Sequence, residues 1–436
     1  MKKFLALALA LAMALSLAAC GKKADDNNKG NGDEAKGSVY YLNFKPEADK
    51  AWQDLAKTYT ETTGVEVKVV TAASGQYDTM LTSELDKSAP PTMFQVGNQG
   101  AVNSYGDFCY PLDNTDVMKE MTTQDFNLKN ANGETVSIGY CYEAYGIIVN
   151  KGLLKQAGYE ITDITNFESL KKVADDIHAR ANELGFDAFS SAGLDGSSSW
   201  RFSGHLANMP LFYEFRDDNV TSQPATIKGT YLDNFKNVWD LYTTDTATTG
   251  AALATATNDE SEAEFGEGKA VFYSQGNWEW SALQEKGMNA DDLTMIPYYC
   301  GVSGEEKAGL NSGTENRLAI NDSTSDEDKK ATMDFWLWLV TDPEASKEMV
   351  AQLGVLPYTD AAKGDNDYLN KAEELSKAGN YTMDWATNYQ PNVDQYRKGL
   401  VSALNSYTAD QSDANWETFK TAFVDGWAQN YKVENA

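Results

Sequence analysis

Strands and helices alternate in the hydrophobic pattern that begins near residue 38. An apolar run at 39–44 is typical of a strand, and apolar residues then recur at helical spacing over 48–59. Pro46 suits the first turn of that helix and Gly64 suits its end. Residues 65–70 alternate apolar with polar, as a half-buried strand does. This order predicts a βαβ unit whose two strands run parallel.

The same alternation continues along the chain and predicts an α/β fold. Further strands are expected at 92–96, 143–150 and 270–273, and further helices at 77–87, 153–158, 167–184 and from 326 to a stop before Pro343. Ser325 can cap the last of these helices. The final part of the chain looks largely helical, and no internal repeat is visible. The folded part is too long for one core, so we expect two lobes.

The first residues predict export from the cytoplasm. Lys2 and Lys3 precede an apolar run at 4–14 that is too short to span a bilayer. The run ends in Leu-Ala-Ala-Cys, which resembles the bacterial lipobox, so we expect a signal peptide at 1–19 and a diacylglycerol-bearing Cys20. An ordinary cleaved signal peptide with an idle cysteine is the alternative. Residues 20–37, rich in Gly, Asn, Lys and Asp, would form a flexible tether.

Charge and cysteine content narrow the possible partners. The formal net charge of −29 disfavours nucleic acid and anionic lipid surfaces, and an uncharged ligand fits it most easily. Besides Cys20 there are Cys109, Cys141 and Cys300, whose spacing suggests no metal site. One pair could form a disulfide, or all three could be buried small side chains.

Three segments resemble the carbohydrate-binding extracellular solute-binding family that includes maltose-binding protein. Residues 142–151 (YEAYGIIVNK) are similar to the segment that crosses from the first lobe to the second, although Val149 stands where the family has Tyr. Residues 265–280 are similar to its Gly-Lys-Ala run followed by Gly-x-Trp-x-Trp. Residues 335–357, ending Gly-Val-Leu-Pro, are similar to a helix and turn that return to the second lobe.

The resemblance implies a hinged, two-lobe fold of the periplasmic-binding-protein type (class II) with the ligand in a cleft between the lobes. It implies a monomer, without cofactor or metal, that delivers a carbohydrate to an ABC permease outside the cytoplasm. By analogy, lobe one would comprise 38–147 and 304–352, and lobe two 148–303 and 353–436.

The same resemblance gives the first candidates for ligand contacts. A sugar ring has weakly apolar faces and a rim of hydroxyls, so its site needs flat aromatic and polar side chains. Trp278 would stack on a ring, with core packing beside Trp280 as the alternative. Glu143 would accept from hydroxyls, unless it is a surface or hinge carboxylate.

Other candidates follow strand ends, where parallel sheets collect ligands, or lie in the helical tail. For each of them packing or turn formation is the alternative, and for the two residues of the tail core packing is the preferred interpretation. These candidates are Asn43 and Phe44 after the first strand, Asn98 and Gln99 after the third, Trp200 and Arg201 in a serine-rich loop, and Trp385 and Tyr396 in the tail.

Two other functions stay open. A peptide or polyamine could be the solute, and a polyamine would need several carboxylates in the cleft. A lipid-anchored glycosidase would need only two carboxylates. His178 and His205 are the only histidines, and neither lies in a metalloprotease or nucleophile-elbow pattern. No phosphate-binding glycine loop is present. We therefore expect a binding protein and not an enzyme.

Overall fold

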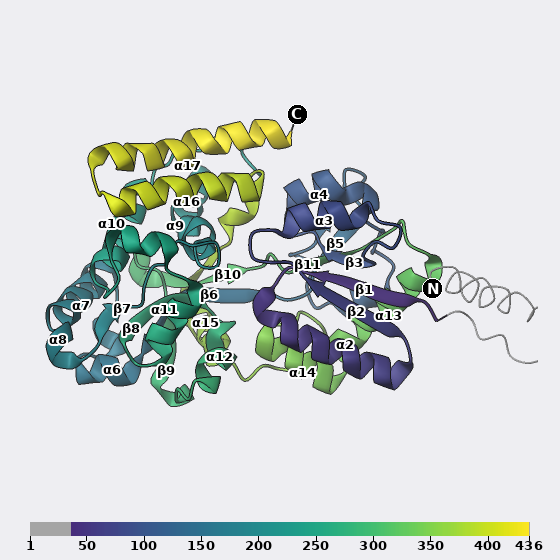
Figure 1. The fold of residues 1–436 in the computed structure, drawn as a ribbon, viewed down its shortest axis with the longest axis horizontal. Coiled ribbons are helices and arrows are strands. Elements are labelled where there is room, and N and C mark those ends of the chain that lie inside the picture. The colour runs from purple at the N-terminus through teal and green to yellow at the C-terminus, as the bar shows by residue number, and fades with distance from the viewer. Residues whose placement is uncertain (1–35, 436) are drawn as a thin grey trace, which may run out of the picture. The chain divides into compact units, whose positions relative to one another are not determined.

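The computed structural model describes residues 36–435 (Figure 1). The expected signal peptide, Cys20 and nearly all of the tether therefore lie outside the described residues. Within the described part no helix is both long enough and apolar enough to cross a membrane.

The first sheet has six strands in the order β2-β1-β3-β11-β5-β4. Strand β1 pairs in parallel with β2 and β3, and β11 pairs antiparallel with both β3 and β5. The βαβ unit predicted from the first seventy residues is confirmed. The strands are β1 (Ser38–Asn43), β2 (Glu66–Thr71), β3 (Met93–Gln95), β4 (Leu128–Lys129), β5 (Thr135–Gly139) and β11 (Arg317–Ile320).

Helices cover both faces of this sheet (Figure 1). Successive residues of a strand face opposite sides, so a strand that is apolar throughout needs a packing partner on each face. Tyr41 packs with α2 on one face, and Leu42 packs with α3 on the other. We call this sheet with its helices the first lobe. One face is covered by α2 (Asp49–Thr63), α5 (Asp116–Glu120), α13 (Asp326–Thr341) and α14 (Pro343–Gln352), and the other by α3 (Tyr77–Leu85) and α4 (Gln99–Tyr105).

The second sheet also has six strands, in the order β12-β10-β6-β8-β7, with β9 paired to β6. Its central strand β6 is buried from Glu143 to Val149, which is why the sequence there reads as a nearly continuous apolar run. The strands are β6 (Glu143–Asn150), β7 (Asp187–Phe189), β8 (Ala270–Gly276), β9 (Leu293–Ile296), β10 (Ala308–Gly313) and β12 (Tyr381–Asp384).

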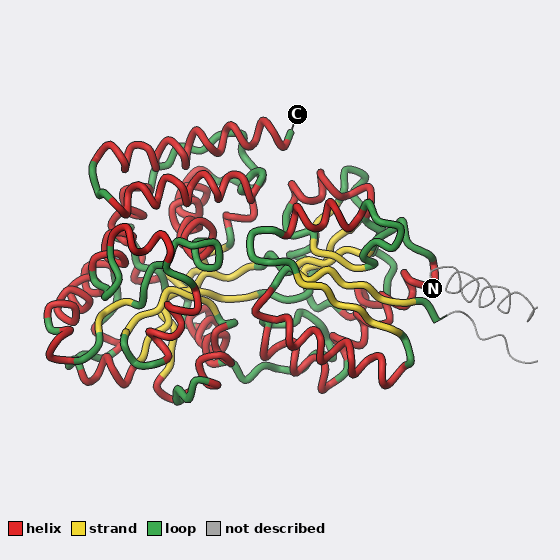
Figure 2. Tube along the Cα trace, in the orientation of Figure 1, coloured by secondary structure: helices red, strands yellow, loops and turns green. Residues whose placement is uncertain are grey.

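Helices also lie on both sides of the second sheet (Figure 2). We call this sheet with its helices the second lobe. The larger core involves α6 (Lys151–Gln156), α7 (Phe167–Ala179), α9 (Ala207–Asp218), α10 (Leu232–Thr244), α16 (Val393–Ala409) and α17 (Asp413–Glu434), with α8 (Ala181–Leu184) packed at its edge. The smaller core involves α11 (Asn258–Gly266), α12 (Glu279–Glu285) and α15 (Asp367–Lys377).

The helix predictions hold with two refinements. The helix expected at 167–184 is broken at Arg180 into α7 and α8. Ser325 caps α13 as expected, and Pro343, which was expected only to stop that helix, opens α14 under a cap from Asp342.

The chain passes between the two sheets three times: at 140–142, at 314–316 and between α14 and α15. The first and third passages are tied together, since Tyr142 and Val355 exchange two backbone hydrogen bonds of 2.9 Å. Strands β6 and β10 belong to the second sheet, and Tyr358 packs in the core of the first. We therefore propose lobe boundaries near 142, 314 and 360 in place of those at 147, 303 and 352.

Cys109, Cys141 and Cys300 are all buried and unpaired among the described residues. A disulfide between any two of them, one of the alternatives left open by the sequence, is not formed. Burial raises the pKa of each thiol, to about 12 for Cys109, so these side chains act as small apolar groups.

Candidate functional site

Aromatic side chains of the second lobe converge where the lobes meet. The imidazole of His205 touches the rings of Tyr145, Trp200, Trp278 and Trp385, at centroid distances of 4.2, 5.1, 5.2 and 5.5 Å. We call these five residues the aromatic cluster. Trp278 and Trp385 are buried, whereas Trp200 and His205 are partly exposed, so the cluster reaches solvent. The sequence predicted three of its members as ligand contacts.

The end of β8 positions Trp278. Its indole folds back over Gly276, where a Cβ atom would lie 2.2 Å from the ring, so only glycine fits there. Its N–H donates to Oε1 of Gln275 at 3.0 Å. The ring is 9% exposed and contacts Trp200 at 5.8 Å. Trp280 packs instead against Tyr368 in the smaller core.

A buried ion pair from two lobes lies beside the cluster. Lys45, in the loop after β1, pairs with Glu143, the first residue of β6, and both are less than a tenth exposed. The ammonium also lies 5.5 Å from the centre of the Trp278 ring. The ion pair and the indole therefore lie in contact with each other across the junction of the two lobes.

The two charges depend on each other. Burial raises the pKa of Glu143, and the nearby positive charge of Lys45 opposes that rise. Burial alone would lower the pKa of Lys45, but attraction to Glu143 and Glu47 outweighs it and leaves that pKa above its usual value. Each charge compensates the other, so the pair presents little net charge to a ligand.

A second ion pair lies near His205. Arg397 of α16 donates to Glu315 at 2.7 Å and to Gln390 at 2.7 Å. Glu315 belongs to the second passage between the lobes. The guanidinium packs against Gly204, where a Cβ atom would lie 3.2 Å from its central carbon. The residue type at 204 thus lets Arg397 reach the turn that carries His205.

Arg201 does not reach toward a ligand, which was the role considered for it. It is 1% exposed, and its guanidinium donates to Ser191, Ser198 and Ser261 inside the second lobe. Burial lowers its pKa, and the surrounding acceptors keep it bound in place. Arg201 anchors a loop, while its neighbour Trp200 lies in the cluster.

Four other candidates have structural partners of their own. The amide of Asn43 binds Lys45 and Thr71 and shapes the turn that carries Lys45. Asn98 caps α4, and Gln99 is exposed and binds the carbonyl of Lys129. Tyr396 is in the core between α16 and α17, where core packing was the preferred reading.

Phe44 remains close to the site. It is partly exposed, meets Tyr77 edge-on at 6.1 Å and lies 5.9 Å from the ammonium of Lys45. Lys45, His205, Glu315 and Arg397 were not predicted. Of these four, only Lys45 could have been predicted from the sequence, because it directly follows Asn43 and Phe44, the two candidates at the end of the first strand.

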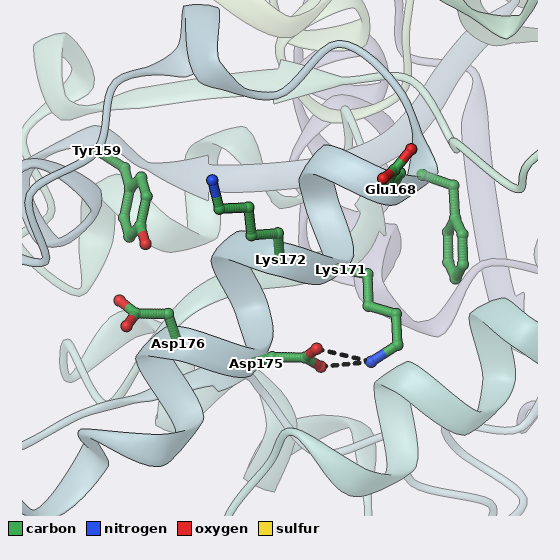
Figure 3. Close-up of a pocket in the computed structure, with 7 residues that line it drawn as sticks. Tyr159, Glu168, Lys171, Lys172, Asp175 and Asp176 are labelled. Carbon is green, nitrogen blue, oxygen red and sulfur yellow. Dashed lines mark hydrogen bonds and ion pairs between the residues drawn. The ribbon is translucent and has the colours of Figure 1, made fainter.

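Two surface cavities lie away from the cluster. One, of about 690 Å³, is open and lined by α7 residues and Tyr159, where Lys171 pairs with Asp175 (Figure 3). The other, of about 460 Å³, lies between α5 and α13. No group of His, Cys, Asp and Glu among the described residues could hold a metal ion.

Solved structures with the same fold include proteins of known ligands. RafE of Streptococcus pneumoniae, in complex with raffinose, is 15% identical over 92% of this chain and 100% of its own, with a TM-score of 0.70. A sugar transporter of Bacillus licheniformis, in complex with stachyose, is 16% identical over 90% of this chain and 100% of its own, with a TM-score of 0.66. The GacH receptor of Streptomyces glaucescens, studied with acarbose, is 15% identical over 92% of this chain and 99% of its own, with a TM-score of 0.65.

The sequence has no significant match among curated proteins. The structural likeness establishes the fold, which is that of periplasmic solute-binding proteins with two α/β lobes. Residues 54–373, well over half of the chain, match the family model for bacterial extracellular solute-binding proteins. The chain therefore belongs to the bacterial extracellular solute-binding protein family.

Proposed function

We propose that this protein captures an uncharged mono- or oligosaccharide between its lobes and delivers it to an ABC permease. The observation that carries the proposal is the aromatic cluster beside the Lys45–Glu143 pair, where both lobes contribute. The C–H faces of a sugar ring suit the indoles, and its hydroxyls suit the charged groups and the imidazole. The sugar complexes of RafE and the Bacillus licheniformis protein support the same ligand class.

Movement of the lobes would complete the site. The first two passages, 140–142 and 314–316, are short, and hinge closure around a ligand is the usual motion of such folds. Ligand would favour the closed arrangement because only there do both lobes contact it. We further propose that the chain is extracytoplasmic and held at the membrane by a lipid on Cys20, on the strength of the lipobox-like sequence.

Charge at the site favours a neutral ligand over a polyamine. Glu143 is already compensated by Lys45, and Glu315 by Arg397. We also propose that the protein is not a glycosidase, since neither carboxylate is free to act as an acid or nucleophile.

Calorimetric titration of the purified protein against raffinose, stachyose, acarbose and chitooligosaccharides tests the proposal. We expect at least one to bind with micromolar or tighter affinity and to be recovered unchanged after prolonged incubation. Release of smaller sugars would identify an enzyme instead. Failure of every sugar, together with binding of a peptide or polyamine, would refute the carbohydrate assignment.

A further inference from the structure

The turn that carries His205 has an uncommon backbone. Residues Arg201–Leu206 form a π-helix that continues directly into α9. π-helical turns are rare and are frequently found at functional sites. Two arginines support this one. Arg201 fixes its beginning to buried serines, and Arg397 packs against Gly204 in its middle.

The π-helix places the His205 imidazole at the centre of the cluster with its polar atoms free. The ring touches four aromatic side chains, but neither ring nitrogen is hydrogen-bonded to any residue within 36–435. The side chain is partly exposed, and neither of its nitrogens is fully buried. Each nitrogen therefore keeps some contact with solvent at the edge of the aromatic cluster.

The protonation state of the imidazole suits one class of ligand. Burial among the rings lowers the pKa of His205 to about 3, and Arg397, Lys45 and Arg201 lower it further while Glu315 opposes them. At neutral pH the ring is uncharged, with one nitrogen that donates and one that accepts. A hydroxyl has the same dual character, whereas an ammonium group can only donate.

We propose that His205 is a specificity-determining ligand contact that hydrogen-bonds a hydroxyl of the solute while the neighbouring indoles pack on its apolar face. This rests on the proposed carbohydrate function and names the residue that distinguishes a polyol from a purely apolar or cationic solute. The π-helix is the device that holds this ring in place.

The test compares two replacements of His205 with a matched control at the other histidine. His205→Phe keeps a flat ring but removes both nitrogens, and His205→Gln supplies a donor and an acceptor without the ring. His178→Gln changes an exposed histidine on α7 that pairs with Asp187. Thermal unfolding verifies that each variant is folded.

For any sugar that the original protein binds, we expect His205→Phe to weaken affinity about tenfold or more, the loss typical of an unmade hydrogen bond. We expect His205→Gln to lose clearly less and His178→Gln to bind normally. Affinity of His205→Phe within about twofold of the original would overturn the proposal.

Ring ¹⁵N spectra separate this proposal from the carbohydrate assignment. The His205 signals are those lost in His205→Gln, and they should report a neutral ring in exchange with water before ligand is added. Slow exchange, from a hydrogen bond within the protein, would overturn the proposal without any ligand. If only a non-sugar solute binds, the carbohydrate assignment fails. A ring shift with that solute still supports the contact, and no shift overturns it.

Discussion

Lys45 and Glu143 form a buried ion pair that joins the loop after β1 in the first lobe to the start of β6 in the second. The two residues are far apart in the chain and come together only because β1 ends, and β6 begins, at the junction of the lobes. The pair therefore contributes both to the site and to the coupling of the two lobes.

Replacing Lys45 with Met should destabilise the protein strongly. The carboxylate of Glu143 would remain buried without a counter-charge, and breaking one side of such a pair costs about 3–5 kcal/mol of unfolding free energy. Adding Glu143→Gln to Lys45→Met should recover part of that loss. Urea denaturation measures all three proteins. Lys50→Met, which breaks an exposed pair with Asp54, is the control and should leave stability nearly unchanged, because water screens that pair. Equal losses in Lys45→Met and Lys50→Met would contradict the argument.

Trp278→Ala should weaken sugar binding by about 1–3 kcal/mol, the value of one large apolar side chain. Titration calorimetry measures the loss. Trp280→Phe is the matched control, because this neighbouring ring packs on Tyr368 in the smaller core. It should lower the unfolding temperature and leave sugar affinity unchanged. The reverse pattern would place the ligand contact at Trp280.

We expect the side chain of Asn277 to stabilise the segments that connect the two lobes. Its side chain accepts from the N–H of Ala144 at 2.7 Å and donates to the carbonyl of Leu353 at 3.3 Å, and its own carbonyl accepts from Asn366 at 2.9 Å. It is 1% exposed, so Asn277→Ala leaves buried backbone groups unpaired, at a cost of about 2–4 kcal/mol.

Urea denaturation measures that cost, and hydrogen exchange at the Ala144 amide should become faster in the same variant. Asn370→Ala removes an exposed amide on α15 and should alter neither quantity. An Ala144 amide that remains equally protected in Asn277→Ala would show that the hinge does not depend on this side chain.

Stability should depend on pH through Glu279. Burial raises the pKa of this carboxyl to about 8, Glu262 adds to the rise, and Arg201 and Lys286 oppose it. Its Oε2 is buried without a hydrogen-bond partner among the described residues. The folded protein therefore holds a proton that the unfolded chain releases near 4.5. This contribution is complete below pH 4.5 and is lost as the pH rises through about 8.

Glu279→Gln removes that dependence, because the amide is uncharged at every pH. Relative to the original protein, the variant should gain stability between pH 5 and pH 9, by a few kcal/mol at the upper end. Denaturant titrations at several pH values measure the difference. A constant difference over that range would mean that Glu279 is not protonated in the folded protein.

Local patterns were enough to predict much of the fold. The helix from Asp49 to Thr63 shows a clear apolar stripe, and β6 is apolar over nearly its whole length because both its faces are covered. Strand β11 had no such signal. Its four residues resemble any short apolar segment, and only the partners β3 and β5 define it.

The site was predicted in part, for a related reason. Trp278 belongs to a local motif, and the structure brings it to the lobe junction. The role of His205 depends on four rings from other parts of the chain, which no local pattern contains. For Arg201, residue type suggested a ligand contact, but the direction of the side chain is set by serines up to 73 residues away.

The position of β11 also has a consequence for how the chain is made. This strand lies between β3 and β5, yet it follows β5 by about 180 residues, a delay of roughly 10–40 s at ordinary rates of synthesis. Until residues 317–320 emerge from the ribosome, β3 and β5 each have an open edge, and the N-terminal half cannot complete its sheet. The first sheet of the nascent chain therefore stays incomplete through most of translation, and chaperones can bind its open strand edges during that time.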